Sequence, residues 1–211
     1  MAISRSVLQR LPLYLNTLRQ LPPETATISA TALAARLDLG DVQVRKDLAS
    51  ICGGGRPRTG YRVPALRTAL ENALGFNDKN HAVIVGAGKL GLALLEYQGF
   101  SDYGLDILAA FDTDPAKTAL HLSRPVLPMD ELESFCHANN VCIGVVTAPA
   151  SQAQSICDRL SQCGIRAVWN FAPTHLTAEP DMLIQNENMA ASLALLRQHL
   201  RERTEPEAPL G

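Results

Sequence analysis

Residues 81–91 read His-Ala-Val-Ile-Val-Gly-Ala-Gly-Lys-Leu-Gly. Their apolar part is typical of a buried parallel strand, and glycines 86, 88 and 91 follow it with the spacing Gly-x-Gly-x-x-Gly. In this spacing the first glycine permits a tight turn, the second lets the backbone approach a pyrophosphate, and the third lets helix and strand pack closely. The stretch therefore predicts the start of a Rossmann-type domain, with phosphate bound at the helix N-terminus.

The position of this stretch is informative as well. About 75 residues of a different character precede it, and about 125 follow its first glycine, too few to add a separate catalytic domain. A second apolar strand, 107–111, ends in Asp112, 21 residues after Gly91. An acid at that spacing accepts hydrogen bonds from the adenosine ribose and repels a 2′-phosphate, so the cofactor predicted is NAD(H) rather than NADP(H).

Strands and helices continue to alternate after Asp112. We expect a short strand at 126–127, a helix over 129–138, a strand over 141–146, a helix over 150–162 and a strand over 165–169. The loops after the last two strands lie at the carboxyl edge of such a sheet, where ligands bind. The predicted cofactor-binding residues are Gly86, Ala87, Gly88, Lys89, Leu90, Gly91, Asp112, Thr113, Asp114, Thr147, Ala148, Pro149, Asn170, Phe171 and Ala172.

Charge is distributed unevenly along the 211 residues, whose formal net charge is −2. Residues 1–75 carry ten Lys and Arg and five Asp and Glu, a balance of +5. Residues 76–211 carry nine basic and sixteen acidic side chains, a balance of −7. A small basic domain joined to an acidic one is typical of a polyanion-binding module with a regulatory partner.

Helical periodicity dominates the basic part. A first helix has an apolar stripe of Leu11, Tyr14, Leu15, Leu18 and Leu21. We expect Pro12 in its first turn, where a missing N–H is tolerated, and Pro22-Pro23 beyond its end. Ser29 is expected to cap a second helix, which residues 38–41 terminate.

A third helix is predicted over residues 42–48, capped by Asp41. Val44 and Leu48 would face inward. The outer face would carry four polar side chains: Gln43, Arg45, Lys46 and Asp47. Two short helices joined by a tight turn that contains glycine form a helix-turn-helix motif, whose second helix enters the major groove of DNA.

Residues 53–63 read Gly-Gly-Gly-Arg-Pro-Arg-Thr-Gly-Tyr-Arg-Val, a composition typical of a β-hairpin tip followed by a strand. Such a wing brings guanidinium groups to phosphates or to a narrow minor groove. A helical hairpin over 29–50 and a solvated loop over 52–60 would explain the segments separately, but their order and charge favour binding to double-stranded DNA. The predicted DNA contacts are Ser29, Gln43, Arg45, Lys46, Arg56 and Arg58.

The totals exclude several classes of protein. No run approaches 18 apolar residues and the N-terminus lacks signal-peptide features, so we expect a cytoplasmic protein without a membrane span. The five cysteines form neither a Cys-x-x-Cys pair nor a Cys/His cluster, which predicts reduced, mostly buried thiols and no metal site. A redox-sensing role of Cys52 stays open.

We therefore expect an α/β chain of several parts. A winged helix-turn-helix domain would occupy residues 1–76 and a Rossmann-type parallel-sheet domain residues 80–186. An amphipathic helix over 188–203, with leucines at near-helical spacing, would need a partner surface. A flexible tail is expected over 204–211.

With both modules in hand, the chain resembles the Rex family of bacterial redox-sensing repressors over nearly its whole length. The motifs that carry the resemblance are Val44-Arg45-Lys46-Asp47-Leu48, Gly60-Tyr61, the glycine turn with Tyr97 and Phe100, Phe111-Asp112-Thr113-Asp114-Pro115, Thr147-Ala148-Pro149 and Asn170-Phe171-Ala172-Pro173. The resemblance implies a homodimer that represses genes of anaerobic or fermentative metabolism, binding its operator when NADH is scarce and releasing it when NADH rises. It also implies that the C-terminal helix is a dimerisation helix exchanged between subunits.

The chain departs from the family at its interdomain switch. In the family an Arg and an Asp help to couple the domains, near the Tyr at the position of Tyr97, and here Asn16 and Asn188 stand at those two positions. Two amides can still hydrogen-bond to each other without leaving an orphan buried charge. Glu187 or Arg19 would substitute if the register slips. We therefore expect Asn16, Tyr97 and Asn188 at a switch of altered chemistry.

Two other functions are considered. A small NAD-dependent dehydrogenase with a basic accessory domain would use Lys89, His121, His137 or His175 as acid or base, but none has a partner at a diagnostic spacing. A module that binds CoA or another nucleotide would tolerate loss of Asp112. The favoured function is that of a repressor and not of an enzyme.

Sensing would then depend on the nicotinamide ring. A pocket walled by Phe171, Ala148 and Pro149 should favour NADH, because the oxidised ring carries a charge that is expensive to bury. A symmetric dimer should read a near-palindromic operator, with Arg45 and Lys46 contacting bases or phosphates.

Overall fold

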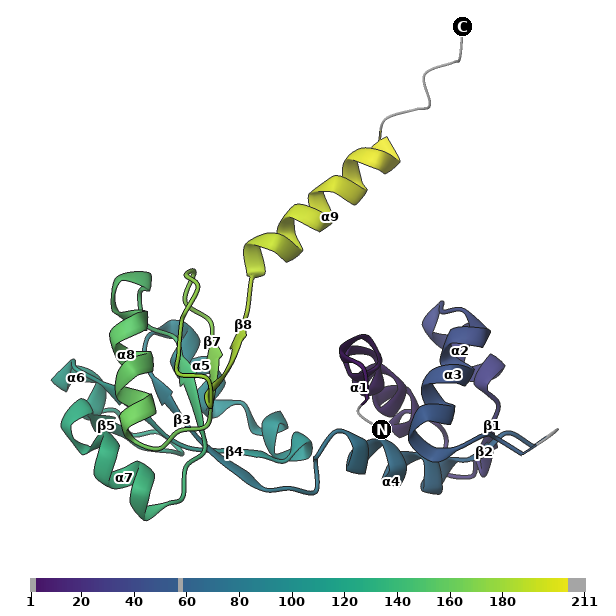
Figure 1. The fold of residues 1–211 in the computed structure, drawn as a ribbon, viewed down its shortest axis with the longest axis horizontal. Coiled ribbons are helices and arrows are strands. Elements are labelled where there is room, and N and C mark those ends of the chain that lie inside the picture. The colour runs from purple at the N-terminus through teal and green to yellow at the C-terminus, as the bar shows by residue number, and fades with distance from the viewer. Residues whose placement is uncertain (1–2, 57–58, 205–211) are drawn as a thin grey trace, which may run out of the picture. The chain divides into compact units, whose positions relative to one another are not determined.

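The computed structural model of the chain describes residues 3–56 and 59–204, without the side chains of residues 203 and 204. It divides into two compact units, each with its own apolar core (Figure 1). The N-terminal unit is Met1–Lys79 together with Ser101–Gly104, and the C-terminal unit is Asn80–Phe100 together with Leu105–Gly211. In the part of the chain that the structure describes, no helix is long and apolar enough to cross a membrane.

The N-terminal unit packs helices around one core. Its elements are α1 (Arg5–Arg19), β1 (Thr27–Ile28), α2 (Ala30–Leu37), α3 (Asp41–Cys52), β2 (Tyr61–Arg62) and α4 (Val63–Ala73). The predicted apolar stripe of α1 is its buried face, and Leu11 and Leu15 on that face share a core with Leu48 of α3. The sequence did not predict α4, whose buried Leu66 and Leu70 complete this core.

Two predicted helix starts were wrong. Pro12 lies inside α1, not in its first turn, because Ser4, eight residues before it, caps the helix by accepting the Val7 N–H. Asp41 is the first residue of α3 and Gly40 is the N-cap. The Asp41 carboxylate instead pairs with Arg45 one turn later, at 3.2 Å. The predicted cap of α2 is confirmed, since Ser29 Oγ accepts the Ala32 N–H at 3.0 Å.

The wing is built differently from the predicted hairpin. Strand β2 is only two residues long and pairs antiparallel with β1, which precedes α2, through Thr27–Arg62 and Ile28–Tyr61. A single bridge between Arg56 and Gly60 closes the loop. Gly60 has φ +72°, and a Cβ there would lie 2.3 Å from the Ile28 carbonyl oxygen, so the turn requires glycine.

The C-terminal unit contains a six-stranded parallel sheet of order β5-β4-β3-β6-β7-β8 (Figure 1). Its strands are β3 (Asn80–Val85), β4 (Leu105–Asp112), β5 (Val126–Pro128), β6 (Ile143–Val146), β7 (Ala167–Asn170) and β8 (Leu183–Asn186). Its helices are α5 (Lys89–Glu96), η1 (Gln98–Tyr103, whose end belongs to the N-terminal unit), α6 (Pro115–Thr118), η2 (Met129–Glu131), α7 (Leu132–Ala138), α8 (Ala150–Gln162) and α9 (Met189–Thr204). The doubly wound order confirms the predicted α/β class.

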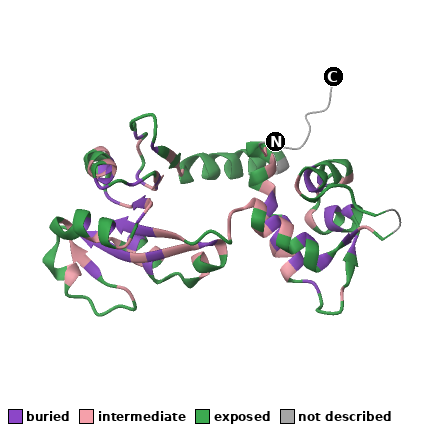
Figure 2. Ribbon diagram, turned by 60° about the horizontal axis from the view of Figure 1, so that its bottom comes forward, coloured by how far each residue is buried: buried purple, intermediate pink, exposed green. Residues whose placement is uncertain are grey.

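Strand alternation divides the apolar side chains between the two faces of the sheet. Val83 and Val85 of β3 belong to the cluster that includes Leu160 of α8, whereas Ala82 and Ile84 belong to the cluster that includes Leu95 of α5. Both faces are covered, so residues 82–85 of β3 and 144–146 of β6 are buried, as expected for the central strands of a parallel sheet (Figure 2).

The C-terminal region adds a strand and a helix, of which the sequence predicted only the helix. The sequence did not predict the edge strand β8, because its residues do not alternate clearly between apolar and polar. Helix α9 follows β8 and includes Thr204, the first residue of the expected tail; residues 205–211 lie outside the described part of the chain. Residues 189–202 are all exposed (Figure 2). The four leucines of α9 are each more than half exposed: Leu193, Leu195, Leu196 and Leu200.

Candidate functional site: a nucleotide pocket and a DNA-binding helix

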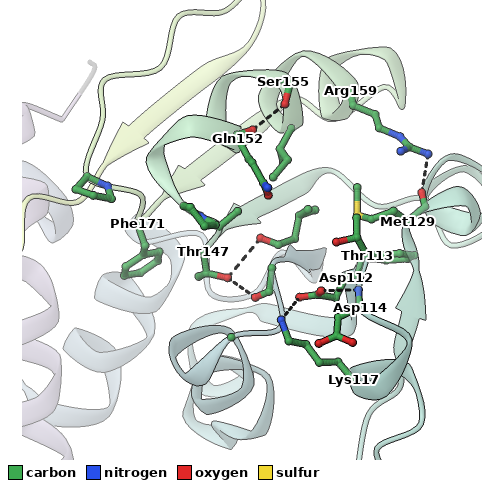
Figure 3. A pocket seen from close by; sticks show the side chains of 18 residues that line it. Asp112, Thr113, Asp114, Lys117, Met129, Thr147, Gln152, Ser155, Arg159 and Phe171 are labelled. Atoms are coloured by element: carbon green, nitrogen blue, oxygen red, sulfur yellow. Dashed lines mark hydrogen bonds and ion pairs between the residues drawn. The ribbon is translucent and has the colours of Figure 1, made fainter.

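A cavity of about 870 Å³ opens at the carboxyl edge of the sheet (Figure 3). Nine of the fifteen predicted cofactor residues line it: Gly86, Gly88, Asp112, Thr113, Asp114, Thr147, Ala148, Pro149 and Phe171. They come from the ends of β3, β4, β6 and β7, which a parallel sheet brings to one edge. The volume is in the range of pockets that hold small molecules and cofactors.

The three glycines of the turn are required for different reasons. A Cβ on Gly91 would lie 2.0 Å from the Gly86 carbonyl oxygen, so this glycine lets α5 pack on the turn. Gly86 has φ +108°, and its Cβ would lie 2.9 Å from Ala148 N. A Cβ on Gly88 would meet no atom of the described residues within 4 Å. Space for a ligand therefore explains Gly88, whereas the fold itself requires the other two.

Asp112 joins the end of β4 to the glycine turn. Its Oδ2 accepts the Ala87 N–H at 2.7 Å. The same oxygen lies 2.9 Å from the Lys117 ammonium, and Oδ1 accepts the Asp114 N–H at 2.9 Å (Figure 3). Burial acts to raise the pKa of Asp112, but these hydrogen bonds outweigh it and hold the pKa below its ordinary value. Asp112 is therefore an ionised acceptor at the position expected for the ribose hydroxyls.

Two loops complete the opposite wall of the cavity. Thr147 Oγ1 donates to the Gly86 carbonyl at 2.7 Å and so fixes the loop after β6 to the glycine turn. The fully buried Asn170 side chain accepts the Ala172 N–H at 2.9 Å and donates to Thr174 O at 2.8 Å. Asn170 therefore shapes the loop that places Phe171 in the cavity wall.

Six predicted cofactor residues lie outside the cavity lining: Ala87, Lys89, Leu90, Gly91, Asn170 and Ala172. Ala87, Gly91, Asn170 and Ala172 are buried beneath it, and Lys89 and Leu90 are exposed at the start of α5. No side chain caps this helix, so its first amides remain available to an anionic ligand.

Sequence reasoning missed a second group of lining residues: Lys117, Met129, Gln152, Ser155, Ile156 and Arg159. Gln152, Ile156 and Arg159 follow one another on α8 at intervals of four and three, so they share a helix face. That spacing, directly after the Thr147-Ala148-Pro149 loop, was the signal that could have found them. Arg159 also ties α8 to η2, because its Nη2 donates to Met129 O at 2.6 Å.

The second candidate site is the outer face of α3. Gln43, Arg45 and Lys46 are exposed there, as predicted, and Ser29 at the start of α2 is exposed too. Among the residues that the structure describes, Arg45 pairs only with Asp41, and both side chains are about half exposed, so this ion pair contributes little and leaves the guanidinium available. Arg56 in the wing is exposed, and Arg58 lies outside the described residues.

Asp47, predicted on the same outer face, is instead buried, with 4% of its surface exposed. A helical turn of 3.6 residues places position 47 beside the inward-facing Val44 and Leu48, and Arg10 and Tyr14 of α1 provide polar partners. Burial acts to raise the pKa of Asp47, but the hydrogen bonds from these two side chains outweigh it and lower the pKa. Burial and the Asp47 carboxylate raise the pKa of Tyr14 to about 12.

The three predicted switch residues have different environments. Asn16 Oδ1 accepts a long hydrogen bond of 3.5 Å from the Tyr103 hydroxyl within the N-terminal unit. Tyr97 is half exposed and stacks edge-on against Phe100 at 4.9 Å within the C-terminal unit. Asn188 caps α9, because its Oδ1 accepts the Ala191 N–H at 2.9 Å.

The cysteines agree in part with the prediction. Cys136, Cys157 and Cys163 are buried, Cys142 is half-buried and Cys52 is exposed, and all five are free thiols. The Cys52 sulfur, which donates to Leu48 O, is nevertheless partly withdrawn from water, and this desolvation raises the pKa of the thiol. A raised pKa disfavours the reactive thiolate and so argues against redox sensing at Cys52. No group of His, Cys, Asp and Glu among the described residues could hold a metal ion.

Two family models match the chain. The model described as a putative DNA-binding protein N-terminus matches residues 2–49, and the model described as a CoA binding domain matches residues 77–174. The two matches correspond to the helix-turn-helix segment and to most of the parallel sheet.

Curated relatives cover nearly the whole chain. The redox-sensing transcriptional repressor Rex of Treponema denticola is 39% identical over 89% of this chain and 90% of its own length. The repressor of the same name from Bacteroides fragilis is 36% identical over 92% of this chain and 89% of its own length.

Solved structures agree over both units. The structure of RSP in complex with NAD⁺ and operator DNA matches with a TM-score of 0.88 and 31% identity, covering 96% of this chain and 94% of that chain. RSP in complex with NADH matches with a TM-score of 0.86 and 96% coverage of both chains. A related structure describes RSP as a Rex-family repressor.

A helix-turn-helix unit and a Rossmann-type unit with a nucleotide pocket, in one chain, define the class of ligand-responsive transcriptional regulators. Within that class the relatives leave no ambiguity, because their identity exceeds 30% over nearly the full length. The chain belongs to the Rex family of redox-sensing transcriptional repressors.

Proposed function

We propose that this protein is a repressor that binds operator DNA as a homodimer and is released when NADH binds, so that it reports the ratio of NADH to NAD⁺. The observation that carries the proposal is the match of both units to a repressor solved with operator DNA and NAD⁺, and separately with NADH. We place the DNA-binding domain in residues 1–76 and the NAD(H)-binding domain in residues 80–186. Such a repressor acts on the chromosome, which places it in the cytoplasm.

Two surfaces support the proposal. Gln43, Arg45 and Lys46 lie exposed on α3, as required of a helix that enters a major groove. At the other site, the ionised Asp112 lies beside the glycine turn, where it would accept from ribose hydroxyls and repel a 2′-phosphate.

Discrimination between the redox forms would occur at the nicotinamide end. Phe171, Ala148 and Pro149 all line the cavity, so the ring would meet an apolar wall. Burying the positive charge of oxidised nicotinamide there without a partner would cost free energy that the neutral reduced ring does not. Moving the protein from 1:99 to 99:1 between its two forms requires about 5.5 kcal/mol of differential affinity.

The dimer would be formed by α9, residues 188–203 in the proposed division. Four leucines and Met189 of this helix are exposed, and an apolar helix surface of this kind needs a partner. The resemblance to the family supports exchange of this helix between subunits.

The alternative of a dehydrogenase is not supported by the cavity. His121, His137 and His175 are exposed and do not line it, and Lys89 lies outside the lining. We therefore propose a regulator without enzymatic activity. The CoA-binding alternative shares the fold of residues 77–174, and binding that survives loss of Asp112 would favour it over NAD(H).

One experiment tests the proposed function directly. Fluorescence anisotropy would follow a labelled duplex of the RSP operator with NADH or NAD⁺ added separately. We expect binding without nucleotide and with NAD⁺, and release with NADH. Equal affinity of the protein for NADH and NAD⁺, or no binding to duplex DNA under any condition, would contradict the proposal.

A further inference from the structure

Four residues of the chain leave the sheet unit and return to it. Ser101–Gly104 lies between Phe100 and Leu105, both of which belong to the C-terminal unit, yet its contacts place it in the N-terminal unit. The single 3-10 helix η1 therefore begins in one unit and ends in the other. We call Ser101–Gly104 the strap.

The strap is held in the N-terminal unit mainly through Tyr103. This ring packs edge-on against Phe76 at 5.0 Å, and the Arg19 guanidinium lies over it at 5.9 Å. The hydroxyl of Tyr103 donates to Asn16 Oδ1 at 3.5 Å. A hydrogen bond of this length is weak, so the ring contacts contribute more to holding Tyr103 in place. Arg19 also pairs with Glu71 of α4 at 3.3 Å, so Tyr103 contacts a fixed cation of α1.

The backbone of the strap fits just as closely. Gly104 has φ +71°, and a Cβ there would lie 2.8 Å from the carbonyl oxygens of Phe76 and Asp78. Asn80 follows Asp78 by two residues, and Leu105 directly follows Gly104. These two residues pair as the first residues of β3 and β4. The strap is therefore tied to the strands that support the nucleotide pocket.

On the other side, the strap continues a row of aromatic side chains that starts at the cavity. Phe171 lines the cavity and contacts Trp169 at 4.8 Å. Trp169 contacts Phe100 edge-on at 5.7 Å, and Phe100 directly precedes the strap. Within the N-terminal unit, α1 in turn holds the DNA-binding helix α3, because Arg10 and Tyr14 bind Asp47.

We propose that the strap couples the nucleotide pocket to the DNA-binding helix, with Tyr103 as its positioning residue on α1. In this arrangement Asn16 has a role of its own, because it accepts the hydrogen bond from the Tyr103 hydroxyl. A change at Phe171 is transmitted through Trp169 and Phe100 to the strap, and through Tyr103 to α1 and α3. This inference rests on the proposed function, since it needs NADH and DNA to bind the same chain.

The test measures coupling and not binding alone. The full-length protein with Tyr103→Ala is compared with wild type and with Ser101→Ala, which alters an exposed side chain of the same segment. For each, the operator Kd is measured with and without saturating NADH, and the NADH Kd is measured from the fluorescence of Trp169. A second variant inserts two glycines between Phe100 and Ser101. The insertion leaves Tyr103 intact but makes the chain that connects Phe100 to the strap longer and more flexible.

In wild type and Ser101→Ala, NADH should raise the operator Kd by a large factor. In both the Tyr103→Ala and the insertion variant this factor should fall by about ten-fold, while the NADH Kd is retained within about two-fold, because only the coupling free energy is lost. The role of the strap would be overturned if NADH raised the operator Kd of the insertion variant by the same factor as in wild type. It would also be overturned if Tyr103→Ala weakened operator binding equally with and without NADH. Absence of any NADH effect in wild type would instead refute the proposed function.

Discussion

Asp47 of α3 forms a two-point ion pair with Arg10 of α1, in which Nε lies 2.7 Å from Oδ2 and Nη2 lies 3.0 Å from Oδ1. The Tyr14 hydroxyl donates to the same Oδ2 at 2.6 Å. With its amide oxygen turned towards Arg10, Gln43 accepts from Nη1 at 3.1 Å. The buried carboxylate therefore fixes α3, the helix proposed to bind DNA, to α1, and Arg10 also orients one of the side chains expected to contact DNA.

Replacing Asp47 should disrupt this arrangement. Asp47→Ala leaves Arg10 and Tyr14 without their acceptor, which should lower the free energy of unfolding of the N-terminal unit by about 3 kcal/mol. Tyr14→Phe, which removes one donor and keeps the ion pair, should lose only about 1 kcal/mol. Far-UV circular dichroism during urea unfolding would measure both, because the single tryptophan reports the C-terminal unit. Equal losses in the two variants would show that the ion pair contributes nothing.

The same carboxylate makes stability depend on pH in a defined direction. The pKa of Asp47 is lower in the folded protein than its ordinary value near 3.9, so the unfolded chain binds more protons and unfolding free energy rises with pH. The contribution is fully present above about pH 4 and is lost as pH falls through the lowered pKa. The difference in stability between wild type and Asp47→Asn should therefore narrow below about pH 4. A difference that stays constant from pH 6 to pH 3 would contradict the shift.

The glycine turn offers a comparison between ligand space and packing space. Gly88→Ala should fold normally, since its Cβ meets none of the described atoms within 4 Å and φ is −76°, yet it should weaken NADH binding by about ten-fold, or about 1.4 kcal/mol. Gly91→Ala should destabilise the C-terminal unit by about 1–3 kcal/mol, because its Cβ would collide with the Gly86 carbonyl. Thermal unfolding followed by Trp169 fluorescence and NADH titration would separate the two effects. Full NADH affinity in Gly88→Ala would place the ligand elsewhere.

Arg45 and Lys46 should affect operator binding in different ways. Arg45→Ala should weaken specific binding by about 1–3 kcal/mol if the guanidinium reads a base. Lys46→Ala should reduce the slope of log K against log salt by about one if the ammonium contacts a phosphate. Arg67→Ala, on an exposed face of α4, is the matched control and should change neither quantity. Anisotropy titrations over a range of salt would test this, and unaltered affinity in Arg45→Ala would rule out its contact with DNA.

The ion pair between Asp112 and Lys117 should control the choice of coenzyme. Asp112→Ser removes the proposed ribose acceptor and frees the ammonium that now lies 2.9 Å from Oδ2. We expect NADH binding to fall by about ten-fold and the relative affinity for NADPH to rise, because a free cation favours a 2′-phosphate. The double variant Asp112→Ser/Lys117→Met should lose the gain for NADPH. Calorimetric titration with both coenzymes would measure the ratio of the NADPH and NADH affinities. If Lys117 plays no part, this ratio should be the same in the single and the double variant.

Some of this site was accessible from local sequence. Ser29 as a helix cap and the exposure of Arg45 and Lys46 follow from rules that act within one or two turns of chain. The burial of Asp47 was missed because its partners Arg10 and Tyr14 lie more than 30 residues away. A polar residue next to the apolar face of a helix is expected to be exposed unless a distant segment supplies polar partners. Here the facing helix α1 supplies them and buries Asp47.

The sequence by itself determined the alternation of strands and helices along most of the sheet unit, the glycine turn and the acid that follows it. Each depends on a short apolar period or on the backbone freedom of a few residues. Only the tertiary structure decided that Lys117 and Arg159 enter the pocket, that β2 pairs with β1, and that Ser101–Gly104 belongs to the N-terminal unit. These relationships join residues far apart in the chain, and their free energy comes from packing and charge pairing that no local pattern records.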